Sequence, residues 1–405
     1  MMVVEGFCDP ASAAVREEFE RNFRERGEVG AAVCVTVDGK PVIDLWGGLA
    51  DRATGRPWQR DTLVRVWSCT KGAVGLCAHL LADRAQLDLD AQVTRYWPKF
   101  GQAGKDTIPV RWLLDHQAGI PAIRSPLRPG EIYDWNSVTA RLAEEAPFWP
   151  PGTRQGYHAT TFGHLIGELV RRVDGRDIGR FFRDEVAGPL GLDFHIGLPA
   201  GEEGRVAPTI RADPTPPGEP VWRFLEATRD PDSLQSLVMR NTGHRGPRDF
   251  DSPEAYRAVL PSQGGIANAR GLAGLYTPLA MGGEFNGVRL ADANSLARMR
   301  AVSSATAVDA VLLTGLRFSL GFMKSSDNRR ASPGARDSLI LSENAFGHAG
   351  MGGSLGFADP AARMAFGYVM SKQGRGVLLN DRGQRLVDAV YRSLGCRSDR
   401  AGVWI

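Results

Sequence analysis

The spacing of hydrophobic positions changes sharply near residue 70. Thr62 to Trp67 is a run of strand-forming residues, whereas Gly72 to Leu81 is apolar on nearly every side. β-Branched and aromatic residues favour extended backbone, and a helix that is apolar all round is a buried helix. The pattern therefore predicts a strand that passes directly into a buried helix.

An alternating pattern predicts a hairpin nearer the N-terminus. Val33, Val35 and Val37 occupy every second position, Asp38-Gly39 supplies a two-residue turn, and Val42 to Trp46 returns. This arrangement is typical of two antiparallel strands with one buried face.

The C-terminal part predicts two further strands, Leu355 to Ala358 and Arg363 to Met370, joined by an Asp359-Pro360 turn. Helices are expected at Ala11 to Glu25 and Asn380 to Leu394. We expect these strands to complete the sheet begun by the N-terminal hairpin, with the two helices flanking it.

The middle of the chain is expected to be helical. Apolar residues recur at helical spacing from Phe162 to Val173, whereas residues 201–261 are rich in proline, glycine and charge. The latter predict an irregular cover, with a loop at Pro208 to Pro220. The expected fold is α/β (α+β): residues 1–61 and 262–405 form a lobe with an antiparallel sheet, and residues 62–261 form a mainly helical lobe.

Composition is that of an ordinary enzyme. The 405 residues exceed the ~250 to 300 at which single cores stop growing, which favours two lobes. A net charge of +3, from 49 basic and 46 acidic residues, gives no reason to expect nucleic acid or a membrane as partner. We expect a small-molecule substrate, and nothing in the sequence indicates an oligomeric state.

The sequence favours the cytoplasm. The N-terminal residues are too short an apolar run, and too acidic, for a secretory signal, and no run of eighteen apolar residues occurs. Five scattered cysteines, an odd number, read as reduced thiols.

Candidate chemistry begins at Ser68 and Lys71, where the predicted strand becomes a helix. Positions three apart share a helix face, so the lysine amine can reach the serine hydroxyl. A serine is a poor nucleophile until a base removes its proton, and a helix N-terminus favours developing negative charge. The pair therefore predicts an acylating serine.

Two distant segments accompany this pair. A Pro/Gly-rich loop, residues 150–156, ends in Tyr157, just before the predicted helix at Phe162 to Val173. Near the C-terminus, the glycine-rich run at residues 346–354 leads into the predicted strands. Three separated segments thus supply a nucleophile, a phenol and a glycine-lined strand edge.

In this order and spacing, the three segments resemble the serine β-lactamase-like superfamily, which includes class C β-lactamases and D-alanyl-D-alanine peptidases. The resemblance is closest to family VIII carboxylesterases and related acyltransferases. It extends to Gly30 to Gly48, Val110 to Pro121, Pro261 to Leu279 and Gly367 to Leu394, and so covers most of the chain.

The resemblance implies a role for each site residue. Ser68 is the implied nucleophile, Lys71 its proton partner and Tyr157 a second acid/base group. The backbone N–H groups of Ser68 and Met351 are the implied oxyanion donors. The implied substrate-binding residues are His348, Ala349 and Gly350, and His158 is a further candidate beside Tyr157.

Two departures from the class C pattern bear on the substrate. His348 stands where those lactamases have a lysine, and Ala159 stands where they place an asparagine two residues after the tyrosine. A histidine, with an unperturbed pKa of about 6.5, is mostly neutral at pH 7 and offers a carboxylate no fixed charge. The departures favour a carboxylesterase acting on small neutral esters.

A proton-sharing pair is the expected mechanism. A free tyrosine titrates at about 10 and a lysine at about 10.4, so neither is a good base alone. We expect that a cationic Lys71 lowers the pKa of Tyr157, or that a phenolate keeps the lysine charged. The pair would then deprotonate Ser68 and return the proton to the leaving group.

A second motif competes for the nucleophile. Gly352-Gly353-Ser354-Leu355-Gly356 matches the G-x-S-x-G elbow of α/β-hydrolases, which requires a helix after the serine and a later histidine. Ser354 is followed by a predicted strand, and the last histidine, His348, precedes it. The order of these features therefore does not fit a nucleophile elbow at Ser354.

Other functions remain open at this point. An acyltransferase uses the same acyl-enzyme but passes the acyl group to an amine or alcohol. A β-lactamase, a D-amino-acid peptidase and a non-catalytic binding relative are further alternatives. No metal-ligand spacing occurs among the histidines and cysteines, and we expect no cofactor. Candidates for an apolar acyl pocket are Trp135, Trp149, Trp222, Phe224 and Tyr256.

Overall fold

The computed structural model describes residues 3–246, 249–398 and 403–405. Its main sheet is antiparallel and runs in the order β1-β3-β2-β14-β13-β12, with β4 paired to β3. The strands are β1 (Val4–Cys8), β2 (Gly30–Val37), β3 (Lys40–Asp51), β4 (Arg56–Pro57), β12 (Phe346–Ala349), β13 (Leu355–Asp359) and β14 (Met364–Met370). The predicted hairpin and C-terminal strands thus form one sheet, whereas β1 is an addition that the sequence pattern does not reveal.

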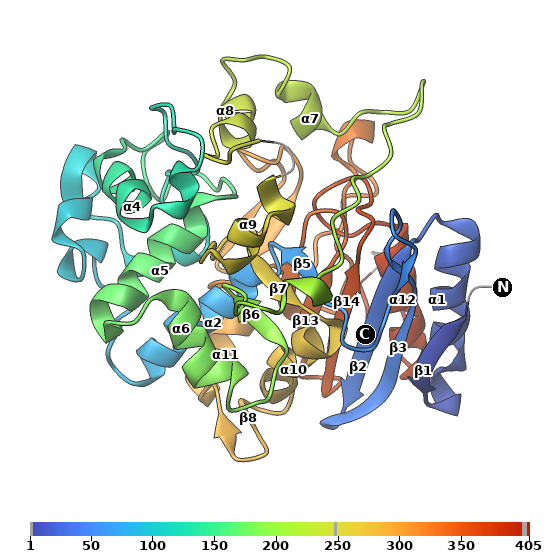
Figure 1. The fold of residues 1–405 in the computed structure, drawn as a ribbon. Coiled ribbons are helices and arrows are strands. Elements are labelled where there is room, and N and C mark those ends of the chain that lie inside the picture. Colours follow the sequence, from blue (N-terminus) through green and yellow to red (C-terminus); the bar gives the residue numbers. More distant parts are fainter. Residues whose placement is uncertain (1–2, 247–248, 399–402) are drawn as a thin grey trace.

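Helices cover both faces of this sheet (Figure 1). Helices α1 (Ala13–Glu25) and α12 (Asp381–Ser393) lie on one face, and α10 (Ala269–Ala280) lies on the other. On the first face, Val33 and Val35 of β2 share a buried cluster with Phe19 of α1. On the second, Gly367 of β14 lets α10 approach closely, because a side chain there would collide with the backbone of the helix.

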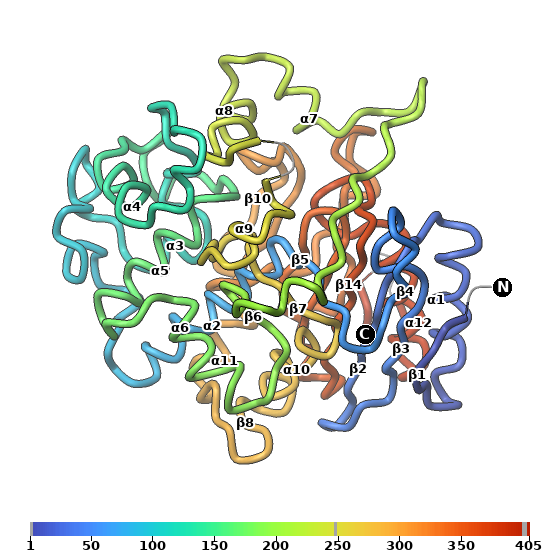
Figure 2. The backbone as a smooth tube through the Cα atoms, in the orientation of Figure 1, coloured from blue at the N-terminus to red at the C-terminus, as the bar shows by residue number. Residues whose placement is uncertain are grey.

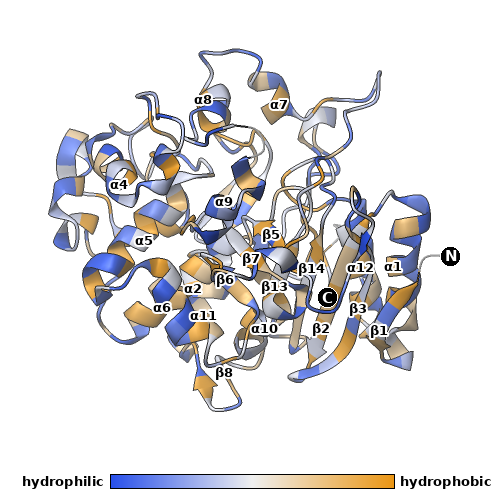
Figure 3. Ribbon diagram, in the orientation of Figure 1, coloured by the Kyte–Doolittle hydropathy of each residue, from blue (hydrophilic) through white to orange (hydrophobic). Residues whose placement is uncertain are grey.

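The helical part of the molecule surrounds α2 (Thr70–Asp83), which is buried from Thr70 to Leu81 as its all-apolar sequence predicts. Figure 3 shows apolar residues along α2 and mixed character on the outer helix α1. A small sheet, β5-β7-β6, joins the two parts. The elements are α3 (Val110–Leu114), α4 (Trp135–Glu144), α5 (Thr161–Asp174), α6 (Ile178–Phe182), β5 (Val64–Trp67), β6 (Phe194–Ile196) and β7 (Gly265–Ala267).

The predicted cover at 201–261 runs from β6 past the end of the main sheet and back to β7 (Figure 2). Ile210 exchanges backbone hydrogen bonds with the segment after β14, at 2.8 Å to Ser371 and 2.8 Å from Gln373. Residues 208–220 hold no helix or strand, in agreement with the predicted loop. Residues 247 and 248 lie outside the described residues. The helices of the cover are α7 (Arg223–Ala227), α8 (Leu234–Arg240) and α9 (Pro253–Arg257).

Part of the sequence after residue 262 packs on the helical side. Helix α11 (Ala293–Arg300) is tied to the end of α2, because the Asp292 N–H donates to the Asp83 carboxylate at 2.9 Å and the Ser295 hydroxyl bonds to the same carboxylate. The division into lobes 1–61 with 262–405 and 62–261 therefore stays a prediction. The remaining strands are β8 (Glu284–Phe285), β9 (Val288–Arg289), β10 (Ser304–Thr306) and β11 (Leu316–Phe318). None of the described helices is long and apolar enough to span a membrane.

Candidate active site

Strand β5 delivers Ser68 to the front of α2 through a strained turn. Trp67 has a φ of +50°, which is uncommon for a residue with a side chain, and α2 begins two residues after Ser68. The Thr70 hydroxyl fixes the turn, because it donates to the Trp67 carbonyl at 2.5 Å and accepts from the Gly265 N–H at 2.9 Å. Ser68 stays partly exposed between buried neighbours.

Lys71 is fully buried, and its amine has three polar neighbours. Its Nζ lies 3.1 Å from Ser68 Oγ, 2.8 Å from the Ala159 carbonyl oxygen and 2.9 Å from the Ser262 carbonyl oxygen. Burial lowers the pKa of Lys71 well below its ordinary value. A neutral amine has two N–H groups for the two carbonyls and one lone pair, which is left for the Ser68 proton. This is the arrangement of a general base.

Tyr157 lies in the loop before α5, with 4 % of its surface exposed. Lys71 Nζ is 4.8 Å from the centre of its ring, and the hydroxyl has no hydrogen-bond partner of good geometry among the described residues. Burial raises the pKa of Tyr157 above its ordinary value, and the neighbouring Ser68 hydroxyl only partly offsets this. Tyr157 therefore presents a neutral hydroxyl, which is a proton donor.

These pKa directions correct one expectation. The sequence led us to expect a charged Lys71 that lowers the pKa of Tyr157, or a phenolate that keeps the lysine charged, whereas burial favours the neutral form of both groups. Desolvation penalises whichever form is charged, and it is the largest influence on each group. The site therefore holds a neutral amine beside a neutral phenol.

A buried carboxylate that the sequence did not single out holds the tyrosine loop. Asp309 Oδ1 accepts hydrogen bonds from the N–H groups of Tyr157, Val311 and Leu312, at 3.0, 2.9 and 2.9 Å. Its other oxygen accepts from the Gln155 amide at 3.2 Å. Asp309 lies far from Tyr157 in sequence and in no recognisable motif, so only the folded structure reveals this contact.

Asp309→Ala is expected to lower the free energy of unfolding by at least about 3 kcal/mol. The substitution leaves three buried N–H groups without their acceptor, and each unsatisfied group costs about 1 to 3 kcal/mol. Urea denaturation followed by circular dichroism measures this loss. Asp309→Asn, which keeps one acceptor oxygen, is the matched control and should lose less; equal stability of wild type and Asp309→Ala would contradict the assignment.

His158 is a scaffold residue in the structure. Its Nε2 accepts the Ile120 N–H at 2.9 Å, its Nδ1–H donates to the Gly156 carbonyl at 2.7 Å, and the side chain is fully buried. Its own N–H donates to Nδ1 of His116 at 3.1 Å. Both ring nitrogens are thus occupied, which differs from the substrate contact expected from its position beside Tyr157.

The glycine-rich segment at residues 346–354 packs against the turn that carries Ser68. The Cys69 thiol donates to the His348 carbonyl at 3.2 Å, and a side chain at Gly350 would collide with the Val66 carbonyl oxygen. The Gly350 N–H then donates to the Ser354 carbonyl at 2.7 Å, which closes a turn with Met351 at its corner. Met351 is 37 % exposed. Cys69 is therefore a packing residue, and the strand edge lies beside Ser68 as the sequence predicts.

His348 is neutral and faces the catalytic pair. Its Nδ1–H donates to the Ala349 carbonyl at 2.7 Å, so its Nε2 carries a lone pair, and that atom has no partner in the described part of the chain. Burial, with Lys71 nearby, lowers the pKa of His348 to about 3. The ring can accept a hydrogen bond but supplies no positive charge at neutral pH.

Ser354 is inaccessible. It is fully buried, its hydroxyl donates to the Met370 sulfur at 3.5 Å, and β13 rather than a helix follows it. The nucleophile elbow is therefore excluded. Within the described ranges, no three His, Cys, Asp or Glu side chains are grouped to hold a metal ion.

The aromatic candidates for an acyl pocket separate into two groups. Trp149, Trp222 and Phe224 join or contact the same apolar cluster as Tyr157. Trp135 instead contacts His164 with tilted rings, and Tyr256 lies against the Arg65 guanidinium. Only the first group thus shares an apolar cluster with Tyr157 among the described residues.

Comparison with known proteins gives matches along nearly the whole chain. Residues 17–390 match the family described as Beta-lactamase. The esterase/beta-lactamase LipL of Mycobacterium tuberculosis (strain ATCC 25618 / H37Rv) is 35 % identical over 381 residues, which cover 91 % of this chain and 82 % of that protein.

Solved structures agree with this match. A penicillin-binding protein homolog from Caulobacter crescentus has a TM-score of 0.85 and 37 % identity, covering 96 % of this chain and all of that one (100 %). A family VIII carboxylesterase has a TM-score of 0.84 and 35 % identity, covering 96 % of this chain and 100 % of its own. The antiparallel sheet with flanking helices is thus the architecture that these proteins share.

Proposed function

Because the chain belongs to the beta-lactamase family, as its match over residues 17–390 shows, we propose that it is a serine carboxylesterase acting on small neutral esters. The enzyme class, a serine hydrolase of the β-lactamase type, follows from relatives named as esterases and β-lactamases. The observation that carries the proposal is the Lys71 amine, buried between two carbonyls, with its third contact on the Ser68 hydroxyl.

Acylation requires the net transfer of one proton from Ser68 to the leaving alcohol, through Lys71 and Tyr157. Lys71 takes the Ser68 proton as Oγ attacks the ester carbonyl carbon, and the carbonyl oxygen becomes an oxyanion at the N–H groups of Ser68 and Met351. When the C–O bond breaks, the Tyr157 hydroxyl donates its proton to the leaving alcohol and regains one from the Lys71 ammonium. The products are a free alcohol and a Ser68 ester.

Deacylation reverses these roles. Water attacks the Ser68 ester, its proton passes to Lys71 directly or through Tyr157, and the second tetrahedral intermediate collapses with return of a proton to Ser68 Oγ. The acid leaves and the site is restored. An amine or alcohol that replaces water at this step gives a transferred acyl product, which is the acyltransferase alternative.

The neutral His348 sets the expected substrate class. A carboxylate-bearing β-lactam finds neither a fixed charge at position 348 nor an amide at Ala159, and each charge-assisted hydrogen bond is worth about 1.5 to 3 kcal/mol. Two missing contacts correspond to a factor of roughly 10² to 10⁴ in acylation efficiency. Neutral esters do not use these contacts and keep their reactivity.

Short p-nitrophenyl esters should therefore exceed penicillins and cephalosporins in kcat/KM by about 10² to 10⁴, measured on one preparation. His348→Lys should narrow the gap by raising lactam turnover, while His348→Gln, which is polar and neutral, leaves it unchanged. Penicillin turnover that equals ester turnover in the unmodified protein would contradict the neutral-ester assignment. An added primary amine that diverts most of the acyl group from free acid to amide would instead assign the acyltransferase alternative.

A further inference from the structure

Arg65 is a buried cation that makes no ion pair with a carboxylate of the described residues. It lies on β5, three residues before Ser68, and is 2 % exposed. Its Nη1 donates to the Gln263 carbonyl at 3.3 Å, and its Nη2 donates to the carbonyls of Phe250 at 2.6 Å and Ala255 at 3.3 Å. The guanidinium lies 5.7 to 5.9 Å from the ring centres of Trp67, Phe250 and Tyr256.

Burying a guanidinium in this way costs desolvation free energy. A charge removed from water is normally compensated by a directly paired opposite charge. Among the described residues, Arg65 instead donates hydrogen bonds to carbonyls and lies against aromatic faces, while Asp249 and Asp251 attract it only from a distance and its Nε is buried without a partner. A methionine or leucine would fill the same space without this penalty. The reason for a guanidinium at this position therefore lies in the segments that it connects.

Arg65 joins the nucleophile strand, the cover and the peptide that holds the general base. Phe250 and Ala255 belong to the cover, whereas Gln263 directly follows Ser262, whose carbonyl accepts from Lys71 Nζ at 2.9 Å. Two successive backbone carbonyls thus accept hydrogen bonds from two different side chains. Arg65 donates to the carbonyl of Gln263, and Lys71 donates to the carbonyl of Ser262.

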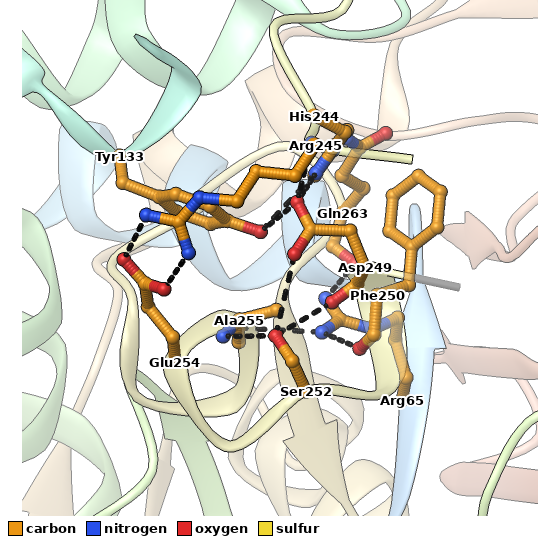
Figure 4. Close-up of polar contacts among 10 residues, drawn as sticks. All are labelled: Arg65, Tyr133, His244, Arg245, Asp249, Phe250, Ser252, Glu254, Ala255 and Gln263. Atoms are coloured by element: carbon orange, nitrogen blue, oxygen red, sulfur yellow. Dashed lines mark hydrogen bonds and ion pairs between the residues drawn. The ribbon is translucent and has the colours of Figure 1, made fainter. Parts of the chain in front are cut away.

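A second contact holds the same peptide through the Gln263 side chain (Figure 4). The Gln263 amide nitrogen lies 3.2 Å from His244 Nε2, and His244 Nδ1 lies 3.4 Å from Asp249 Oδ2. The Tyr133 hydroxyl donates to that same oxygen at 2.6 Å. With Nε2 accepting from the amide, the His244 proton sits on Nδ1 and faces the carboxylate. Gln263 is therefore held at its backbone carbonyl by Arg65 of β5 and at its side-chain amide by His244 of the cover.

We propose that Arg65 is a positioning residue for the general base. It fastens the cover to the 262–263 peptide, which keeps the Ser262 carbonyl on Lys71 and keeps water away from the amine. Loss of this clamp lets the peptide move and lets water reach Nζ, so that Lys71 becomes easier to protonate. The inference rests on the proposed function, because it assigns Arg65 a part in the same acylation step.

Few titratable groups around Lys71, apart from Lys71 itself, can change the pH dependence of acylation. From the tyrosine loop come Tyr157 and His158, from the segment after α3 comes His116, and from β12 comes His348; burial favours the neutral form of each. Cys69, beside the nucleophile, is also neutral because burial raises its pKa. The carboxylates of Asp249 and Asp251 lie on the Arg65 side of the strand. A shift in the pH dependence of acylation thus reports on Lys71.

The test measures how fast a fluorophosphonate labels Ser68 between pH 5 and pH 10 in wild type, Arg65→Met and Arg65→Lys. We expect both variants to label about tenfold more slowly on the acid limb, which moves up by about one pH unit, because below the pKa of Lys71 one unit in pKa is a tenfold change in neutral amine. Arg65→Lys keeps the charge but loses the planar fork, so a shift in this variant isolates geometry from charge.

Arg56→Met is the matched control. Its guanidinium also donates to a carbonyl at the edge of the cover, that of Val206 at 2.7 Å, but it does not touch the 262–263 peptide. This variant should keep the wild-type rate and profile. His244→Leu loosens Gln263 only at its side chain and should shift the profile in the same direction by less, which carries the test if Arg65→Met does not fold.

The outcomes separate this inference from the proposed function. Folded Arg65 variants that label within twofold of wild type with an unmoved profile, or a profile that moves equally in Arg56→Met, would overturn the inference alone. A wild-type protein that is not labelled at Ser68 at any pH would overturn the proposed function, and the positioning role with it. A shifted profile confined to the Arg65 and His244 variants supports both.

Discussion

Ser68→Ala is expected to abolish covalent labelling by a fluorophosphonate and to remove esterase activity down to the background, whereas Ser354→Ala keeps both. Ser68 is partly exposed, lies at the start of the α2 turn and contacts the Lys71 amine at 3.1 Å. Ser354 is fully buried and bonded to the Met370 sulfur. Only the first serine has both access to a substrate and a base.

Intact-mass spectrometry after incubation with the probe measures this directly. Ser354→Ala is the matched control, because it removes the same hydroxyl from the competing motif while the Gly350 to Ser354 backbone contact stays in place. Labelling that survives in Ser68→Ala and disappears in Ser354→Ala would reverse the assignment of the nucleophile.

Lys71→Ala and Tyr157→Phe should each lower the rate of acylation by about 10² to 10⁴, the usual worth of positioned acid/base groups. Lys71→Ala removes the amine that contacts Ser68, and Tyr157→Phe removes the hydroxyl that returns the proton to the leaving alcohol. Presteady-state acylation by an alkyl ester, whose leaving alkoxide must be protonated, measures the step. Because one proton passes through both groups, the double variant should be little slower than either single variant. Additive losses would contradict a common proton path.

The pKa directions set the pH dependence of the wild-type enzyme. Lys71 acts as a base only when neutral, and its lowered pKa means that activity rises with pH well before the ordinary lysine range. Tyr157 acts as an acid only when protonated, and its raised pKa keeps it so through the same range. A plateau that begins well below the ordinary lysine range is expected, and Lys71→Ala should lose the acid limb.

The periodicity of the sequence predicted most of the fold. Val33, Val35 and Val37 do lie on one strand, with the first two buried and Val37 half-buried at its end. The all-apolar run after Ser68 is a buried helix, and the Asp359-Pro360 turn does separate two strands. These elements follow from local patterns that their surroundings do not override. β1 was missed, because Val4 to Cys8 holds a glycine and mostly exposed positions and pairs only as an edge strand.

The candidate catalytic side chains could be proposed from the sequence because serine, lysine and tyrosine stand in a recognisable order. The groups that hold these side chains in place could not be identified from the sequence. Two of the three contacts of Lys71 are backbone carbonyls, of Ala159 and Ser262, and any residue type can supply a carbonyl. Asp309 and His116 contact the tyrosine loop from distant parts of the chain, and no spacing rule links them to Tyr157.

The charge state of the pair was also beyond the sequence. Whether Lys71 and Tyr157 exchange a charge or are both neutral depends on how completely the site excludes water, and that is a property of packing. The same holds for His158, which the sequence placed beside the catalytic tyrosine but which the fold turns into a backbone contact.

The central claim is that an acyl group passes through Ser68. Rapid mixing with p-nitrophenyl butyrate, acid quench within the burst phase and peptide mapping by mass spectrometry test it most directly. We expect a butyryl adduct on the peptide that contains Ser68, and no adduct in Ser68→Ala. Turnover of the ester with no adduct at any quench time, or an adduct on the peptide that contains Ser354, would contradict the account.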